Sequence, residues 1–387
     1  MVENSNKIKL LFRHRSMEMG GVEKVLLSIL SNLNPEKFEM TVCLNLNQGE
    51  LRDEFPKHVR KVYIAEGKED FSKNPLIQKA QLFKRSQLLK KYQKNPELVD
   101  QKILKDTYDI EVGMTYNDFD MVLNSSNKKS KKIGWFHSEI NIPGFEVLAN
   151  GIIKQFPHFD RMVYCSQKIH DLMHVHHPDL HYPSESVITN AIPVDEIRKK
   201  AEEKITDLPH SPVFASVGRL HHRKGYHKLI EAHKKVLDQG FPHNIIVIGD
   251  GEEKKNLEEL IIQHQVEKSF QLIGNRMNPY PYIENSDYFI LSSMSEAWPL
   301  VIAEALLLQK PTIATKTGDI PRMIINNETG LLIDYEVDAM ANAMIKFLND
   351  KEYVNHIKTN LVDIEKQFDN AAIFQSIEDM FLETINQ

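Results

Sequence analysis

Short apolar runs of strand-forming residues alternate with helix-periodic segments along almost the whole chain. A first series of such runs covers residues 7–14, 39–46, 61–65, 109–114, 133–136 and 161–165. A second series covers residues 213–217, 244–248, 270–273, 288–292, 312–314 and 331–333. Strands that alternate with helices predict parallel sheets with crossover helices. We therefore predict an α/β chain of two doubly wound domains that face a cleft, with a junction near residues 192–212.

The length and composition of the chain exclude several other classes. Of 387 residues, 41% are hydrophobic and 26% are charged, which is typical of a globular protein and not of a disordered, collagenous or integral-membrane one. The longest apolar runs are short ones such as residues 288–291, whereas a spanning helix needs about 20 residues. Residues 1–7 carry no hydrophobic region of a signal peptide, and Cys43 and Cys165 make no disulfide framework or zinc cluster. We expect a cytoplasmic protein.

Two candidate site positions follow strands of the first series. Ligands of open α/β sheets sit beyond the carboxyl ends of the strands. The paired glycines Gly20 and Gly21 follow the first strand, where they let a backbone approach a ligand closely and where the next helix favours an anion. His137 closes the strand at 133–136. An ordinary turn and a structural histidine are the alternative interpretations.

A basic loop follows the strand at 213–217 and reads Gly-Arg-Leu-His-His-Arg-Lys-Gly over residues 218–225. An arginine can bind a phosphate bidentately, and a lysine supplies a point charge. Arg219 and Lys224 together therefore suit a diphosphate without a metal ion. The alternative interpretation is a solvated basic loop.

Two glutamates, Glu296 and Glu304, have seven residues between them. We expect Pro299 at the first helical position, where a missing N–H is no loss. This would put Glu296 in the loop before the helix and Glu304 more than one turn inside it. The free N–H groups of Leu300 and Val301 would face an anion on the loop side. The alternative is an amphipathic helix with two surface glutamates, although the apolar neighbours of Glu304 argue against its exposure.

These segments resemble the family-4 retaining glycosyltransferases of the GT-B fold, of the bacterial polysaccharide or glycoconjugate type. The motifs that carry the resemblance are Gly20–Glu23, Ser216–Arg219 with Lys224-Gly225, Val247–Gly251, Ser292-Ser293, the Glu296–Glu304 spacing, and Lys310–Thr315 followed by Gly318. They are most specific over residues 213–333. The chain departs from the family pattern at Ala297, at residues 307–309 and at Arg322.

The resemblance implies two Rossmann-like domains and a role for each. Residues 1–192 would bind the acceptor and be completed by a C-terminal helix at 370–387, and residues 193–369 would bind a nucleotide sugar. Candidate catalytic residues are Arg219 and Lys224 on the donor diphosphate, Glu296 on the donor sugar, and His137 beside that sugar. Glu304 would bind the ribose, and the backbone near 274–276 would meet the base. The donor-binding set is Gly20, Gly21, Gly218, Gly274, Asn275, Arg276, Ala297, Trp298, Pro299, Leu300, Val301 and Glu304.

Breaking a sugar–diphosphate bond develops negative charge on the leaving diphosphate. Fixed cations and a helix N-terminus can stabilise that charge. We therefore expect no metal ion and no other cofactor, since the nucleotide sugar is a substrate.

One strongly basic segment stands out against a net charge of −6. Six cations and no acid lie within residues 79–94, namely Lys79, Lys84, Arg85, Lys90, Lys91 and Lys94, so the other 371 residues carry −12. Five apolar residues interleave with them, broadly on one side of a helix: Leu82, Phe83, Leu88, Leu89 and Tyr92. A basic amphipathic helix favours an anionic membrane surface or a membrane-linked acceptor. The alternative is a core-packed helix with a solvated basic face, and no motif indicates nucleic acid.

A histidine cluster follows in the first domain. His174, His176, His177 and His181 match no standard zinc spacing and have no acidic framework nearby in sequence. We interpret them as a solvated helix end and loop.

The sequence leads to one main functional hypothesis and two alternatives. The main one is a retaining hexosyl- or N-acetylhexosaminyl-transferase that uses a nucleotide-diphosphate sugar, with UDP as the expected carrier. Its acceptor would be a saccharide or a polyprenyl-diphosphate-linked saccharide in cell-surface synthesis, and the protein would be peripheral on the inner face of the membrane. The alternatives are a non-catalytic GT-B subunit of a glycosylation complex and a sugar-nucleotide epimerase.

Overall fold

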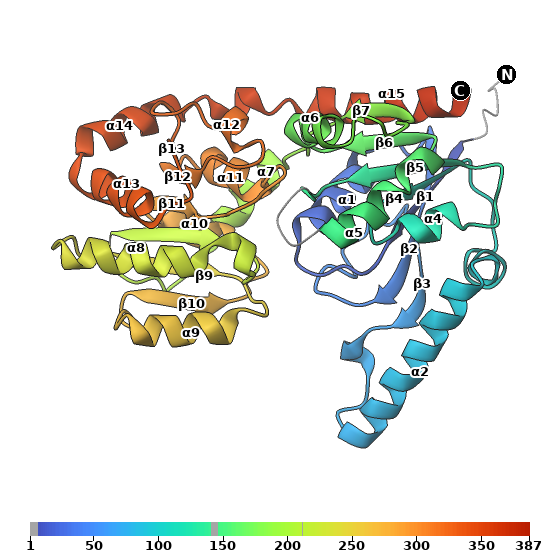
Figure 1. Ribbon diagram of the computed structural model, residues 1–387, viewed down its shortest axis with the longest axis horizontal. Coiled ribbons are helices and arrows are strands. Elements are labelled where there is room, and N and C mark those ends of the chain that lie inside the picture. Colours follow the sequence, from blue (N-terminus) through green and yellow to red (C-terminus); the bar gives the residue numbers. More distant parts are fainter. Residues whose placement is uncertain (1–6, 141–145, 211) are drawn as a thin grey trace. The chain divides into compact units, whose positions relative to one another are not determined.

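The computed structural model describes residues 7–140, 146–210 and 212–387. Backbone contacts divide the chain into an N-terminal unit, Met1–Ala191 with Ala371–Gln387, and a C-terminal unit, Ile192–Asn370 (Figure 1). Residues 1–6, which belong to the segment searched for a signal peptide, and Ser211 of the expected junction lie outside the described residues. Every helix within the described ranges is too short or too polar to cross a membrane.

A seven-stranded parallel sheet forms the N-terminal unit, in the order β3-β2-β1-β4-β5-β6-β7. Its strands are β1 (Ile8–His14), β2 (Phe38–Asn47), β3 (Arg60–Glu66), β4 (Ile110–Gly113), β5 (Lys131–Phe136), β6 (Arg161–Tyr164) and β7 (Ser184–Val187). Its helices are α1 (Gly21–Asn32), α2 (Pro75–Lys94), α3 (Glu97–Val99), α4 (Phe119–Leu123), α5 (Glu146–Ile153), α6 (Gln167–His176) and α15 (Asn370–Asn386). Phe381 of α15 packs edge-on against Phe12 and Phe38, so the last helix completes this core.

A six-stranded parallel sheet forms the C-terminal unit, in the order β10-β9-β8-β11-β12-β13. Its strands are β8 (Val213–Val217), β9 (Asn244–Ile248), β10 (Phe270–Gly274), β11 (Tyr288–Leu291), β12 (Thr312–Thr315) and β13 (Leu331–Ile333). Its helices are α7 (Val194–Ala201), α8 (Tyr226–Asp238), α9 (Lys254–Gln263), α10 (Tyr280–Asn285), α11 (Leu300–Leu307), α12 (Ile320–Met323), α13 (Val337–Asn349) and α14 (Lys351–Asn360). The predicted α/β class is confirmed.

Both sheets reverse their strand order beside their first strand. In the N-terminal unit, β1 has β2 on one side and β4 on the other; in the C-terminal unit, β8 has β9 on one side and β11 on the other. Ligands of doubly wound sheets bind outside the carboxyl ends of the strands at such a reversal. The loops after β1 and β4, and those after β8 and β11, are therefore the places to look for a site.

Helix α2 projects from the body of the N-terminal unit (Figure 1). It begins at Pro75, where the side chain of Asn74 accepts hydrogen bonds from the first free backbone N–H groups. Near its other end, Leu88, Leu89 and Tyr92 pack into the core. The expectation that the apolar side chains of this helix share one side is wrong for Phe83, which is 65% exposed.

Candidate active site

The site in the C-terminal unit brings Lys224 and Glu296 into direct contact. Lys224 comes from the loop after β8 and Glu296 from the loop after β11, and Lys224 Nζ lies 2.6 Å from Glu296 Oε1. Ser293 Oγ donates to the same carboxylate oxygen at 2.6 Å. Both charged side chains are largely buried. The strand-order reversal thus joins two groups that lie 72 residues apart in sequence.

Backbone contacts hold the two loops together around this pair. Ser292 Oγ donates to the carbonyl of Lys224 at 2.9 Å, and the N–H of Met294 donates to the carbonyl of Arg223 at 2.8 Å. Gly225 has a φ of +69°, and a Cβ there would lie 2.1 Å from the carbonyl oxygen of Ser292. Only glycine fits this position, because it adopts a left-handed conformation without a side chain.

Arg219 lies on the same loop but is not part of the buried pair. Its side chain is 74% exposed, and its Nε lies 3.4 Å from Glu252 Oε2. An exposed ion pair of this kind contributes little energy, so the guanidinium is free to turn toward a ligand. Gly218 precedes it, and a Cβ there would lie 2.9 Å from the hydroxyl of Tyr226.

Glu304 is a buried carboxylate on α11. Its side chain is only 2% exposed, and Tyr280 donates its hydroxyl to Glu304 Oε1 at 3.1 Å. Burial and the carboxylate beside it raise the pKa of Tyr280, which keeps this donor protonated. Pro299 is the N-cap and Leu300 the first helical residue, one position later than we predicted. Glu304 still lies more than one turn inside, and its interpretation as a surface glutamate is wrong.

A third loop supports the backbone of Glu296. Gly318, after β12, has a φ of +57°, and a Cβ there would lie 2.3 Å from the carbonyl oxygen of Glu296. The N–H of Asp319 donates to the carbonyl of Ala297 at 2.9 Å. Trp298 contacts Phe368 edge-on, while Ala297, Trp298 and Val301 are all partly exposed.

The expected base-binding segment closes β10. Gly274 has a φ of +76°, and no atom lies within 4 Å of a Cβ built there. Arg276 is engaged elsewhere in the described structure: its Nε donates to the hydroxyl of Tyr282 at 3.0 Å, and its guanidinium lies 3.3 Å from Asp207. The Arg276 side chain is therefore held by Tyr282 and Asp207, and the space beside the Cα of Gly274 is open.

A buried charged cluster occupies the strand-order reversal of the N-terminal unit. His14, the last residue of β1, lies between two carboxylates: its Nδ1 is 3.2 Å from Asp118 Oδ2 and its Nε2 is 3.4 Å from Glu23 Oε1. Burial lowers the pKa of His14, but the hydrogen bonds and charges of Asp118 and Glu23 outweigh it and raise the pKa to about 10. His14 is therefore an imidazolium at neutral pH.

The paired glycines border this cluster. Gly21 is the first residue of α1, and Gly20 is its N-cap. A Cβ on Gly20 would lie 2.2 Å from Glu23 Oε2, so any side chain there would displace the carboxylate that contacts His14. Our sequence analysis did not select His14 or Asp118 for the site. A histidine at a strand end, and the Asp-x-Asp spacing of Asp118 and Asp120, are the signals that point to them.

His137 follows β5 and, unlike His14, is a neutral imidazole at neutral pH. Its ring stacks on Trp135 with a centroid distance of 6.1 Å, and its Nε2 is buried without a hydrogen-bond partner among the described residues. Burial, together with the charge of His14, lowers the pKa of His137 to about 3. A neutral imidazole with a free nitrogen can exchange a hydrogen bond with a ligand hydroxyl.

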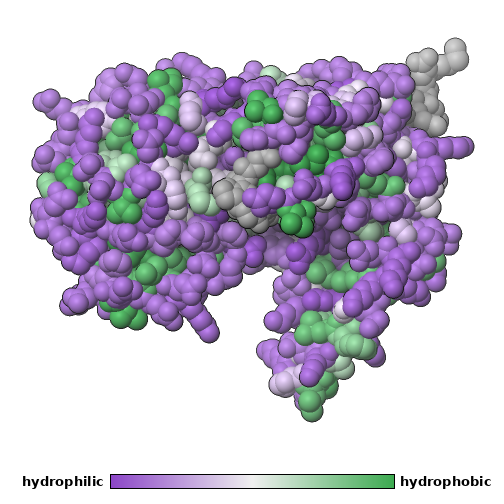
Figure 2. Space-filling model, in the orientation of Figure 1, coloured by the Kyte–Doolittle hydropathy of each residue, from purple (hydrophilic) through white to green (hydrophobic). Residues whose placement is uncertain are grey.

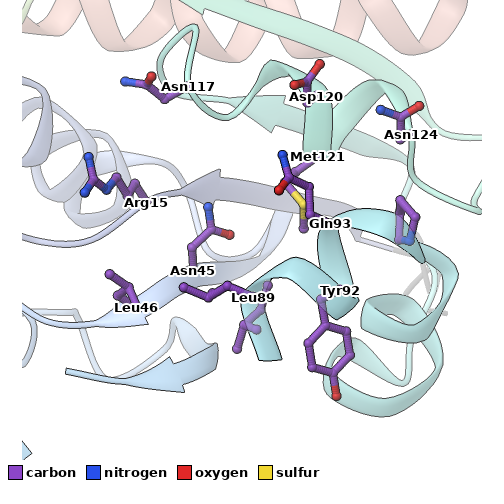
Figure 3. A pocket seen from close by; sticks show the side chains of 12 residues that line it. Arg15, Asn45, Leu46, Leu89, Tyr92, Gln93, Asn117, Asp120, Met121 and Asn124 are labelled. Atoms are coloured by element: carbon purple, nitrogen blue, oxygen red, sulfur yellow. The ribbon is translucent and has the colours of Figure 1, made fainter. Parts of the chain in front are cut away.

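A pocket of about 470 Å³ lies in the same unit (Figure 3). It is lined by Arg15, Asn45, Leu46, Ile64, Leu89, Tyr92, Gln93, Pro96, Asn117, Asp120, Met121 and Asn124. Carboxamides and charged groups are mixed with aliphatic and aromatic surface, and three lining residues come from the last turns of α2. Volumes of this size suit small-molecule ligands.

The comparisons with known proteins agree with this architecture. Residues 198–361 match the family model described as Glycosyl transferases group 1. The chain is 33% identical over 158 residues to an uncharacterized glycosyltransferase of Methanocaldococcus jannaschii. The matched segment covers 38% of each protein. It is 27% identical over 210 residues to the UDP-Gal:alpha-D-GlcNAc-diphosphoundecaprenol alpha-1,3-galactosyltransferase of Escherichia coli. This match covers 52% of this chain and 54% of that protein.

The fold extends over the whole chain. HepE of Anabaena, solved in complex with UDP and glucose, is similar with a TM-score of 0.74 at 18% identity, over 97% of this chain and 100% of that one. Two Rossmann-like units with parallel sheets define a protein of the GT-B fold. The match to the group 1 glycosyltransferase model lies within the C-terminal unit, over residues 198–361. The two curated relatives are matched over only 38% and 54% of their own lengths.

Proposed function

We propose that the protein is a retaining glycosyltransferase that moves a sugar from a UDP-sugar to a saccharide or polyprenyl-diphosphate-linked acceptor in cell-surface polysaccharide or glycoconjugate synthesis. The observation that carries this proposal is the contact of Lys224 with Glu296 at the strand-order reversal of the group 1 domain. The names of two similar proteins support the substrate class, because one is a UDP-Gal galactosyltransferase acting on a diphosphoundecaprenol substrate and the other was solved with UDP and glucose.

In this proposal, the donor separates the buried ion pair. The diphosphate competes with Glu296 for Lys224, and the exposed Arg219 turns onto the same diphosphate. Glu296, released from Lys224, accepts hydrogen bonds from the donor sugar, while Glu304 accepts them from the ribose. As the sugar–diphosphate bond breaks, these fixed cations and the first N–H groups of α11 stabilise the negative charge of the leaving group. No step in this account requires a metal ion.

The acceptor side belongs to the N-terminal unit in this proposal. The carboxamides of Asn45, Gln93, Asn117 and Asn124 line the pocket and suit the hydroxyls of a saccharide. Arg15, which lines the same pocket, has an exposed side chain. The neutral His137 would contact a sugar hydroxyl.

Helix α2 supplies a membrane contact in this proposal. Leu76 and Phe83 are 81% and 65% exposed, and helical spacing places them on the same face as Lys79, Lys90 and Lys94. Figure 2 shows hydrophobic residues at the surface of this projecting helix. Each lysine near an anionic surface contributes about 1 kcal/mol. Such a face would hold the protein beside a lipid-linked acceptor.

Arg85 differs from the other cations of α2. Its guanidinium lies over the ring of Phe71, 5.3 Å from the centroid, and donates to Gln48 at 3.2 Å. It therefore fastens α2 to the body of the unit, and the membrane contact rests on the lysines that share the face of Leu76 and Phe83.

The test is nucleotide release over a panel of donor sugars, with soluble and polyprenyl-diphosphate-linked saccharides as acceptors. We expect UDP release that depends on an acceptor. Donor turnover without any acceptor would indicate an epimerase. Donor binding without turnover across the whole panel would indicate a non-catalytic subunit, and either result would overturn the proposal.

A further inference from the structure

We propose that His170, His174 and Glu185 form a binding site for a divalent transition metal, with Zn²⁺ as the best fit, that fastens helix α6 to the edge strand β7. This site lies within the N-terminal unit and takes no part in the proposed transfer. It does not depend on the proposed function.

The geometry brings three ligand atoms together. His170 and His174 are four residues apart on α6 and therefore share one face of the helix. His174 Nε2 lies 3.0 Å from Glu185 Oε2, and His170 Nε2 lies 3.8 Å from the same oxygen. One ligand atom from each residue lies within 4.8 Å of the other two. A tetrahedral zinc ion, with bonds of about 2.0–2.2 Å, places its ligand atoms at comparable separations.

The surroundings orient both histidines. Asp171 Oδ1 lies 3.2 Å from His170 Nδ1, which leaves Nε2 directed at the site. A carboxylate on the second ring nitrogen is the usual support of a metal-bound histidine. The ring of Tyr182 packs on that of His174 with a centroid distance of 4.1 Å, and its hydroxyl donates to the carbonyl of Met173 at 2.8 Å. The rotamer of His174 is thus fixed by packing.

The chemistry of the ligands selects the metal. Two imidazoles and one carboxylate suit zinc and related transition metals, whereas calcium and magnesium prefer oxygen ligands. All three side chains are partly exposed, so an ion has a path from solvent and room for a water as fourth ligand. A plain ion pair of His174 with Glu185 accounts for one contact, but it does not account for the second histidine on the same oxygen.

This site changes the interpretation of the histidine cluster. Of the four histidines that our sequence analysis grouped, only His174 takes part, and the second histidine lies one turn earlier. The carboxylate comes from β7, a strand that was not predicted because its Ser-Glu-Ser-Val sequence contains no apolar run. Within the described residues, β7 pairs only with β6, so a metal bridge to α6 would strengthen a weakly held edge.

The experiment uses the full chain without an affinity tag, stripped with a chelator and then titrated with Zn²⁺ against a chromophoric competitor. We expect one tightly bound equivalent, and a midpoint of thermal unfolding that rises by several degrees with Zn²⁺ but not with Mg²⁺, because a ligand of the folded state alone stabilises it. Glu185→Gln and His174→Ala should each weaken zinc binding about tenfold or more. His176→Ala, on the same helix but outside the site, should bind as the wild type does.

Two results would overturn the proposal. One is a wild-type chain that binds no stoichiometric zinc and shows no thermal shift. The other is a Glu185→Gln variant that folds and binds zinc as tightly as the wild type, since zinc would then be held by other residues. Glu185→Gln preserves the size of the side chain, so it keeps the test decisive if His174→Ala fails to fold.

Discussion

The two units place charged groups at the same topological position and arrange them in different ways. In the C-terminal unit, one lysine faces one carboxylate. In the proposed function, this pair separates when the donor diphosphate binds. In the N-terminal unit, the imidazolium of His14 lies between Asp118 and Glu23 and is fixed on both sides. A strand-order reversal therefore determines where such charged groups lie, but not what they do. The first arrangement suits exchange of partners with a substrate, and the second suits a permanent part of the fold.

The largest expected effect comes from breaking the exchangeable pair. Lys224→Ala removes the cation expected on the diphosphate, and we expect the rate of transfer to fall about 10²–10³-fold. UDP release with a lipid-linked acceptor measures this. Lys255→Ala is the matched control, because Lys255 is an exposed lysine on α9 of the same unit. Equal rates in wild type and Lys224→Ala would contradict the assignment.

A smaller effect is expected at the buried carboxylate. Glu304→Gln keeps the shape of the side chain and the contact with Tyr280 but removes the charge. We expect the KM for the donor to rise about tenfold, since hydrogen bonds to a charged group are stronger than neutral ones by about that factor. Steady-state kinetics against donor concentration measure it. An unchanged KM would show that the ribose does not reach Glu304.

The cluster of His14, Asp118 and Glu23 should affect how the stability of the protein depends on pH. The pKa of His14 rises from 6.5 to about 10 on folding, so its contribution is fully present below pH 6.5 and is lost as the pH rises through about 10. His14→Gln should therefore lower the free energy of unfolding strongly near pH 6.5 and much less near pH 10. Denaturant unfolding across this range measures the difference. A difference that is independent of pH would contradict the charged state of His14.

The smallest effect concerns the exposed face of α2. Phe83→Ala should leave the free energy of unfolding within about 0.5 kcal/mol of wild type, because the side chain is exposed. It should still weaken sedimentation with anionic vesicles several-fold. Ile262→Ala on α9 is the matched control, since Ile262 is 62% exposed in the other unit. Vesicle binding that changes neither with Phe83→Ala nor with salt would contradict the proposed membrane contact.

The predictability of the fold follows from local patterns. Buried parallel strands have both faces covered, so their sequences are continuous apolar runs that stand out from the helices between them. Edge strand β7 and the start of α2 lack such patterns, and neither was predicted. The elements that pack against α2 determine which of its side chains are buried and which are exposed. The sequence of residues 79–94 alone does not show this.

The candidate site was predictable only in part. The motifs locate Lys224, Glu296 and Glu304 on the correct loops and helix, but the contact of Lys224 with Glu296 depends on β11 returning beside β8 after two intervening strands. His14 and Asp118 meet for the same reason, because β4 returns beside β1. Contacts made by a strand-order reversal join residues far apart in sequence, and no single motif contains both partners.

The central claim is that Lys224 passes from Glu296 to the donor diphosphate. Calorimetric titration of UDP into wild type, Lys224→Ala and Glu296→Gln tests it most directly. We expect Lys224→Ala to bind UDP more weakly, and Glu296→Gln to bind it at least as tightly as wild type, since Lys224 is then no longer held by a carboxylate. Unchanged UDP affinity in Lys224→Ala, or a loss of affinity in Glu296→Gln equal to that of Lys224→Ala, would contradict the claim.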